Sequence, residues 1–231
     1  MAEMVSARPL PDPALLVISD RQQARRPLLE IAAQVFAGGG RWFLLRDKDL
    51  HPHLRMQLAQ ALCELARPHD GAWVSISADL ALAHETQMAF GGPARARVGL
   101  HLQDPGAVEK ARRQLGPSAL IGLSCHDAQA LRAAVAARVD YVTLSPFLPT
   151  QSKPGYGPAL TEAGFARLVV DCPLPVLALG GLTADLYPAA LAAGAAGAAV
   201  MGAVMRADDP AAVIKALLAR AAAHRPPPIA G

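Results

Sequence analysis

The sequence repeats one pattern eight times: a short, mostly apolar run is followed by a longer segment with helical spacing. Because the runs do not alternate regularly between apolar and polar residues, both faces of each predicted strand should be buried. Such burial is typical of a parallel sheet covered by helices. Eight strand–helix units within 231 residues predict a single-domain (β/α)8 TIM barrel, and a doubly wound open sheet is the alternative. The predicted strands are residues 15–18, 42–45, 73–76, 98–102, 120–123, 141–144, 176–179 and 198–201.

Between these strands, the spacing of leucine and alanine predicts the helices. They cover residues 27–37, 54–66, a segment starting at 79, and residues 105–115, 127–137, 161–170, 183–193 and 210–223. The barrel domain is therefore expected to span residues 14–224. Residues 1–13 should form a flexible lead-in, and residues 225–231 a flexible proline-rich tail, because consecutive prolines cannot continue a helix.

The composition fits one globular domain, with 52% apolar and 18% charged residues. The net charge of +3 and the isoelectric point near 9.0 are mild, and the charges are evenly spread. This balance does not predict nucleic-acid binding, although it fits a protein that binds small anions. A genomic preference for arginine over lysine explains the charge equally well.

The cysteines indicate a reducing compartment. Cys63, Cys125 and Cys172 are odd in number and widely spaced, which argues against a disulfide framework and against a structural zinc site. No apolar run approaches the length of a membrane span, and Glu3 and Arg8 interrupt any signal-peptide core. We therefore expect a cytoplasmic protein with no membrane partner, in which Cys125 serves packing.

Barrels of this type carry their chemistry on the loops that follow the strands, and phosphate commonly binds after the seventh and eighth strands. Gly180 and Gly181 follow the seventh strand, and we expect them at the head of a helix, where amides and the helix dipole favour an anion. Polar residues and glycines collect at the strand ends in this sequence: Arg46–Asp47–Lys48, Ser124–Cys125–His126, Thr150 to Lys153, Gly180–Gly181 and Gly202.

The loop after the sixth strand has a composition that no core requires. It leaves the strand through Ser145–Pro146 and carries Thr150, Ser152 and Lys153 among several glycines and prolines. Hydroxyls and an ammonium group beside glycine-freed backbone amides suit an anionic ligand, most often a phosphate. A solvated surface loop is the alternative.

Four motifs occur in order on the predicted loops. They are Arg-Asp-Lys after the second strand, Ser-x-His after the fifth, Pro-x-x-Pro-Thr-x-Ser-Lys after the sixth, and Pro-Val-x-Ala-Leu-Gly-Gly-Leu-Thr around the seventh. Together they resemble the thiamine phosphate synthase and thiazole tautomerase (TenI-like) family. The similarity runs from about Leu15 to Leu218 and is densest between Ile121 and Met205. It implies a transferase of thiamine biosynthesis that acts on small phosphorylated substrates.

Synthases of this family join hydroxymethylpyrimidine pyrophosphate to thiazole phosphate. Pyrophosphate leaves with the help of Mg²⁺, and the thiazole nitrogen captures the pyrimidine-methylene cation. The resemblance implies that Arg46 and Lys48 hold the pyrophosphate, and that Ser124 and Lys153 contact the same group as catalytic candidates. It assigns the thiazole phosphate to Thr150, Ser152, Gly180, Gly181, Met201 and Gly202, the last of which is often a serine in the family.

The chain departs from the family at both usual magnesium carboxylates. The family's Asn-Asp pair at the end of the third strand falls on Ser75 and Ile76, and its aspartate after the fourth strand falls on Gly106. Mg²⁺ would be the cofactor of a true synthase and normally needs one or two carboxylates besides phosphate oxygens. Asp79 and Asp104 lie nearby in the sequence and are the remaining candidate ligands. Each has the alternative role of a helix N-cap.

The tautomerases of the family use a histidine directly after the sixth strand, where this chain has Pro146. His126 is the candidate general acid or base, with hydrogen bonding to loop backbone as the alternative. His101 lies within a strand and is expected to be a core histidine. Three hypotheses therefore stand: a synthase that holds its metal differently, a metal-independent tautomerase-like enzyme, and a non-catalytic binder of phosphorylated ligands. No stripe of residues marks an interface, although barrels of this size often form homodimers.

Overall fold

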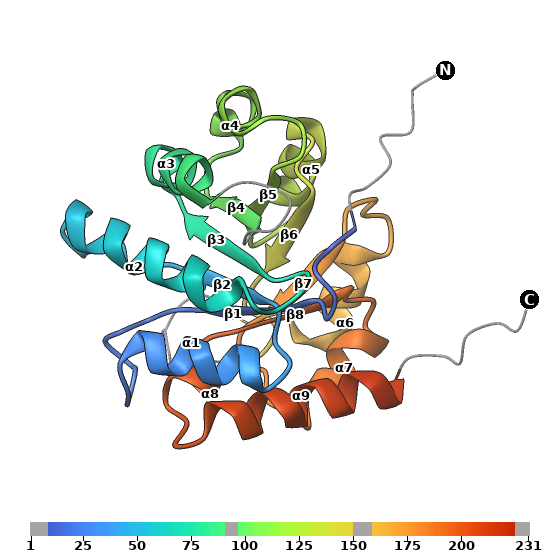
Figure 1. Ribbon diagram of the computed structural model, residues 1–231. Coiled ribbons are helices and arrows are strands. Elements are labelled where there is room, and N and C mark those ends of the chain that lie inside the picture. The colour runs from blue at the N-terminus through green and yellow to red at the C-terminus, as the bar shows by residue number, and fades with distance from the viewer. Residues whose placement is uncertain (1–8, 91–96, 150–158, 225–231) are drawn as a thin grey trace, which may run out of the picture.

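The computed structural model describes residues 9–90, 97–149 and 159–224, which form a closed barrel of eight parallel strands (Figure 1). The strands are β1 (Leu15–Ile18), β2 (Trp42–Leu45), β3 (Trp73–Ser77), β4 (Arg97–Leu102), β5 (Leu120–Cys125), β6 (Tyr141–Leu144), β7 (Val176–Leu179) and β8 (Gly197–Val200). Each strand pairs with the next along the chain, and β1 pairs with β8. The predicted barrel is confirmed, and the open-sheet alternative is excluded because the β1–β8 pairing leaves no sheet edge.

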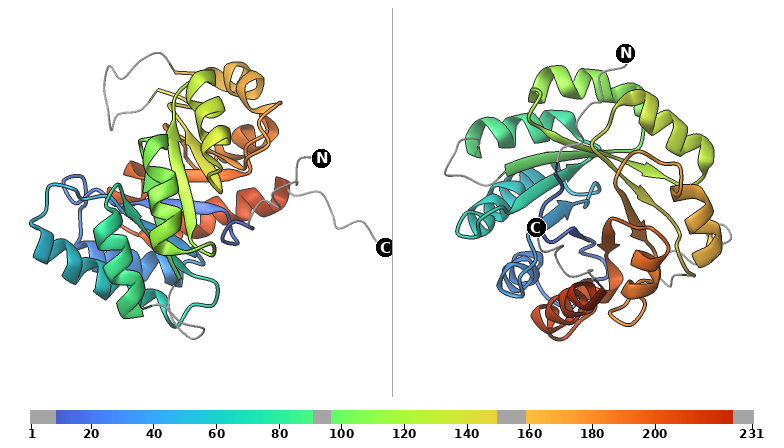
Figure 2. Two further views of the ribbon diagram at one scale, coloured as in Figure 1. Left: turned by 90° about the horizontal axis from the view of Figure 1, so that it is seen from above. Right: turned by 90° about the vertical axis from the view of Figure 1, so that its right-hand side faces the viewer.

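The helices surround this barrel, as the right-hand view of Figure 2 shows. They are α1 (Leu28–Ala37), α2 (Pro52–Ala66), α3 (Leu80–Phe90), α4 (Val108–Leu115), α5 (Ala128–Ala137), α6 (Thr161–Val169), α7 (Tyr187–Ala192), α8 (Gly202–Met205) and α9 (Pro210–His224), with a 3₁₀ turn at Pro105–Ala107. Within the described ranges, no helix is both long and apolar enough to cross a membrane.

The helix predicted over residues 183–193 is wrong at its start, because α7 begins only at Tyr187. Gly180 and Gly181 have φ values of +109° and +67°, which a right-handed helix cannot continue. A turn follows, in which the Tyr187 amide donates to the Thr183 carbonyl over 3.0 Å. The two glycines therefore form a turn and do not head a helix as expected. The short α8 was not predicted.

The interior of the barrel is filled by its own small cluster of buried side chains. Its members are Leu16, Ile18, Trp42, Leu44, Trp73, Leu120, Tyr141, Leu177 and Ala199. Trp42 and Tyr141 meet edge to face, with ring centroids 4.7 Å apart. Gly122 provides the space for the Tyr141 ring, since a Cβ at this position would lie 2.6 Å from the ring atom Cε2. The interior is thus a packed core and not a channel for ligands.

Candidate functional site

A cavity of about 440 Å³ opens at the C-terminal ends of β1, β2, β6, β7 and β8. Five residues singled out from the sequence line it: Arg46, Gly180, Gly181, Met201 and Gly202. Among its described lining residues, the charged side chains are those of Arg46 and Arg206, and both are cations. The cavity therefore combines exposed backbone with positive charge at the place where barrels of this kind bind phosphate.

Gly180 and Gly181 bring backbone rather than side chains to the cavity, because their left-handed φ values favour glycine. A Cβ on Gly181 would lie 2.7 Å from the Pro149 carbonyl oxygen and 2.9 Å from the Leu148 Cβ, so the loop after β6 packs directly on this turn. Among the described residues, the Gly181 amide donates no backbone hydrogen bond. This amide can serve an anionic ligand.

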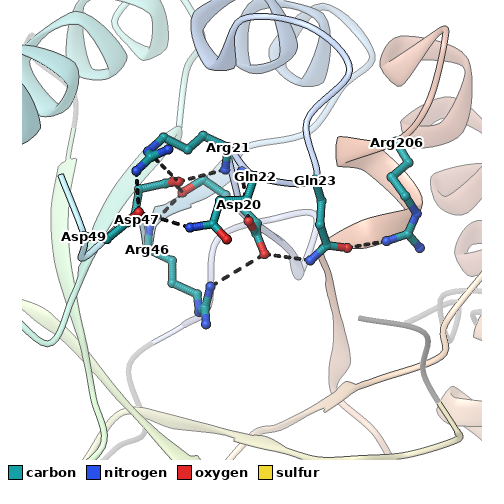
Figure 3. A network of polar contacts seen from close by, with 9 residues as sticks. Asp20, Arg21, Gln22, Gln23, Arg46, Asp47, Asp49 and Arg206 are labelled. Carbon is teal, nitrogen blue, oxygen red and sulfur yellow. Dashed lines mark hydrogen bonds and ion pairs between the residues drawn. The ribbon is translucent and has the colours of Figure 1, made fainter. Parts of the chain in front are cut away.

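Arg46 is held at the rim by hydrogen bonds between the loops that follow β1 and β2 (Figure 3). Its backbone amide donates to the Ser19 hydroxyl over 2.8 Å, and that hydroxyl donates to the buried Asp47 carboxylate. Asp47 also accepts from the Arg21 amide over 2.7 Å. The Arg46 guanidinium itself lies 3.8 Å from the Asp20 carboxylate. The backbone is thus fixed independently of the side chain, which faces the cavity.

Lys48 and Ser124 are not among the described lining residues of this cavity. Lys48 extends toward β4, where its ammonium donates to the Gln103 side-chain oxygen over 3.0 Å. Ser124 is the residue before the last one of β5, next to the C-terminal end of that strand. Of the residues that the resemblance assigns to pyrophosphate, Arg46 lines the cavity, whereas Lys48 and Ser124 are not part of its described lining.

His101 is buried, as expected of a core histidine, and it also contacts Ser124. Its Nε2 lies 3.0 Å from the Ser124 hydroxyl, and its Nδ1 lies 3.0 Å from the Tyr141 hydroxyl. Burial, with a smaller contribution from the positive charge of Lys48, lowers the pKa of His101 to about 4. The imidazole is consequently neutral near pH 7 and holds Ser124 in place through a hydrogen bond.

The depressed pKa of His101 predicts a pH-dependent loss of stability. Above about pH 6.5 the imidazole is neutral in both the folded and the unfolded chain, so it contributes no pH dependence. As the pH falls from 6.5 toward 4, only the unfolded chain takes up the proton, and the free energy of unfolding should decrease by about 3 kcal/mol. Denaturant titrations across this range should show a shallower pH dependence in His101→Gln. The exposed variant His53→Gln is the control, and an equal slope in parent and His101→Gln would contradict the prediction.

The His126 side chain contacts the loop backbone, which was the alternative to a role as general acid or base. Its Nδ1 lies 2.9 Å from the Ser145 carbonyl oxygen and 3.1 Å from the Ser145 hydroxyl, which orients the ring at the rim. A role in proton transfer stays a prediction for this residue. The neighbouring Cys125 is fully buried, and burial raises the pKa of its thiol to about 12, as suits a packing role.

Asp79 and Asp104 both act as helix caps. Asp79 accepts from the Leu82 amide over 3.0 Å and from the Arg55 guanidinium over 2.8 Å. Asp104 accepts from the Gly106 amide over 2.8 Å. Within the described ranges, no group of three or more histidine, cysteine or acidic side chains could hold a metal ion. Both remaining candidate ligands are therefore engaged as caps, and a magnesium ion held by one or two carboxylates and phosphate oxygens stays a prediction.

Three site candidates from the sequence, Thr150, Ser152 and Lys153, lie outside the described residues. Sequence reasoning also missed two residues that the structure brings to the cavity region, Arg206 and Gln23. Arg206 lies four residues after Gly202, a spacing that places both on one face of a helical turn. That spacing is the signal that could have revealed Arg206, whereas nothing in the sequence marks Gln23.

The chain is a (β/α)8 barrel with a glycine-lined cavity beyond β7 and β8, which is the place where barrels of this class commonly bind phosphate. The family profile described as thiamine monophosphate synthase matches residues 15–204, and the chain belongs to this family. The resemblance read from the four loop motifs is therefore confirmed.

The chain is similar to curated relatives over most of its own length and of theirs. The chain is 38% identical to a putative thiamine-phosphate synthase of Geobacter sulfurreducens, with 90% of this chain and 94% of that protein covered. It is 37% identical to a thiamine-phosphate synthase of Halorhodospira halophila, with 86% and 90% covered. A solved thiamine phosphate pyrophosphorylase from Pyrococcus furiosus has the same fold, with a TM-score of 0.76, 23% identity, and 92% and 96% of the two chains covered.

Proposed function

We propose that this chain is a thiamine-phosphate synthase, which joins hydroxymethylpyrimidine pyrophosphate to thiazole phosphate. In this reaction the bond between the pyrimidine methylene carbon and the pyrophosphate oxygen breaks, and a bond from that carbon to the thiazole nitrogen forms. The products are thiamine phosphate and pyrophosphate. The observation that carries the proposal is the cationic, glycine-lined cavity at the β7–β8 rim of a chain that belongs to the family.

The side chains would act mainly by binding and by electrostatic stabilisation. Arg46 and, across the rim, Lys48 would balance the charge of the departing pyrophosphate, and the Ser124 hydroxyl would bind the same group. The Gly180–Gly181 turn would hold the thiazole phosphate, so that the thiazole nitrogen is presented to the pyrimidine carbon. Family synthases use Mg²⁺, which would help the pyrophosphate to leave. Among the described residues, the candidate ligands Asp79 and Asp104 are engaged as caps, and we assign no step to the metal.

Turnover by the purified chain tests the proposal. Both substrates are mixed with the protein, first with Mg²⁺ and then with a chelator, and thiamine phosphate is measured by fluorescence after oxidation. We expect thiamine phosphate to accumulate in the presence of Mg²⁺ and to fall to background with the chelator. Binding of thiazole phosphate without any product under either condition would reject the synthase and favour the non-catalytic binder.

A further inference from the structure

Arg206 reaches back over Gly202 at the edge of the cavity. It caps the C-terminal end of α8, four residues after Gly202, so one helical turn places the two on the same face. A Cβ on Gly202 would lie 2.6 Å from Nη2 and 2.7 Å from Cζ of the Arg206 guanidinium. The guanidinium therefore occupies the space that a side chain at position 202 would fill, and it borders the cavity beside this backbone.

Gln23 orients the Arg206 guanidinium. The Gln23 side-chain nitrogen donates to the Asp20 carboxylate over 2.6 Å, so the Gln23 oxygen faces the opposite way and accepts from Arg206 Nη1 (Figure 3). Asp20 in turn lies 3.8 Å from Arg46. The loop after β1 thus connects the two arginines of the cavity, and their guanidinium groups are held by one network.

We propose that Arg206 is a further substrate-binding residue, which pairs with the phosphate group that enters the cavity beside the Gly180–Gly181 turn. The assignment rests on the proposed function for the identity of the phosphorylated substrate. A guanidinium offers several N–H donors in a planar fork that matches the oxygens of a phosphate. Arg206 and Arg46 are the charged residues among the described lining, and both are cations that can pair with an anionic group.

Phosphate affinity in two arginine variants tests this role. Calorimetry with inorganic phosphate and with thiazole phosphate should show affinities about 10- to 100-fold weaker in Arg206→Gln than in the parent. Affinity for the unphosphorylated thiazole alcohol should be unchanged. The matched control is Arg25→Gln, since Arg25 forms an exposed ion pair with Asp208 and does not line the cavity. Its phosphate affinity should equal that of the parent.

The close approach of Arg206 to Gly202 provides a second, independent variant. The Gly202 backbone has no positive φ, so Gly202→Ala should preserve the fold, and its methyl group should displace the flexible guanidinium. We expect Gly202→Ala to weaken phosphate binding in the parent by about as much as Arg206→Gln does. Added to Arg206→Gln, the same change should have little further effect, because the displaced group is already absent.

The outcomes separate this assignment from the proposed function. If the parent binds inorganic phosphate but not thiazole phosphate, and Arg206→Gln weakens that binding, the synthase proposal fails while the role of Arg206 stands. The assignment is overturned if the parent binds no phosphate, if Arg206→Gln retains the parent's affinity, or if Arg25→Gln loses as much. Parent-like binding by Gly202→Ala would also overturn it.

Discussion

Gly122→Ala is expected to lower the free energy of unfolding by about 3 kcal/mol or more, because the barrel interior has no room for a methyl group. A Cβ at this position would lie 2.6 Å from Cε2 of the Tyr141 ring and still closer to Cζ. The ring cannot move aside easily. It packs edge to face on Trp42 at 4.7 Å, and its hydroxyl is 3.0 Å from Nδ1 of the buried His101.

Thermal unfolding of four variants measures this effect: Gly122→Ala, Tyr141→Leu, the double variant and a control. For a chain of this length, a loss of about 3 kcal/mol lowers Tm by roughly 10 °C. Gly164→Ala is the matched control, since the nearest atom to its Cβ is 3.5 Å away and alanine is favoured within a helix such as α6. The double variant Gly122→Ala/Tyr141→Leu should lose less than the sum of its single changes. A parent-like Tm for Gly122→Ala would show that the interior is not packed as described.

The strand positions could be predicted because a strand that is buried on both faces appears in the sequence as a short apolar run. The runs at residues 15–18, 42–45, 141–144 and 176–179 coincide with β1, β2, β6 and β7, since a strand covered by helices and filled from inside is mostly apolar on both faces. The start of α7 could not be predicted in the same way. The residues before Tyr187 have helical composition, but the preceding glycine turn and the turn at Thr183 delay the helix.

The candidate site was only partly predictable, because some of its residues are placed by their position after a strand and others by contacts between distant segments. Four of its residues lie just after strands: Arg46, Gly180, Gly181 and Gly202. In a (β/α)8 barrel the C-terminal ends of all strands lie at one rim, so the fold alone places these residues together. The contact between Arg206 and Gln23 joins positions 183 residues apart and exists only because β8 closes against β1. A local sequence pattern does not indicate a contact between residues so far apart in the chain. The same holds for the hydrogen bond between His101 and Ser124, which depends on the register between β4 and β5.

The largest functional effect is expected for Arg46→Gln, which should lower kcat/KM for thiamine phosphate formation by about 100- to 1,000-fold. The Arg46 side chain is 40% exposed at the cavity rim and lies 3.8 Å from Asp20, whose own side chain is 14% exposed. After removal of Arg46, the Asp20 carboxylate keeps its hydrogen bonds from the Gln22 amide and the Gln23 side chain. The backbone amide of Arg46 keeps its 2.8 Å hydrogen bond to Ser19 in the variant. The fold should therefore survive, and the loss should fall on stabilisation of the departing pyrophosphate.

Steady-state kinetics with each substrate varied in turn show whether the loss in kcat/KM comes from a lower kcat or from a higher KM. If Arg46 stabilises charge that develops as pyrophosphate departs, kcat should fall more than KM rises for the pyrimidine substrate. Arg113→Gln is the control, because Arg113 pairs with Glu109 on the exposed face of α4 and is not among the described lining residues of the cavity. A raised KM with unchanged kcat would mean that Arg46 only binds the ground state. Parent-like values of both would remove Arg46 from the site, because its guanidinium would then touch neither substrate during the reaction.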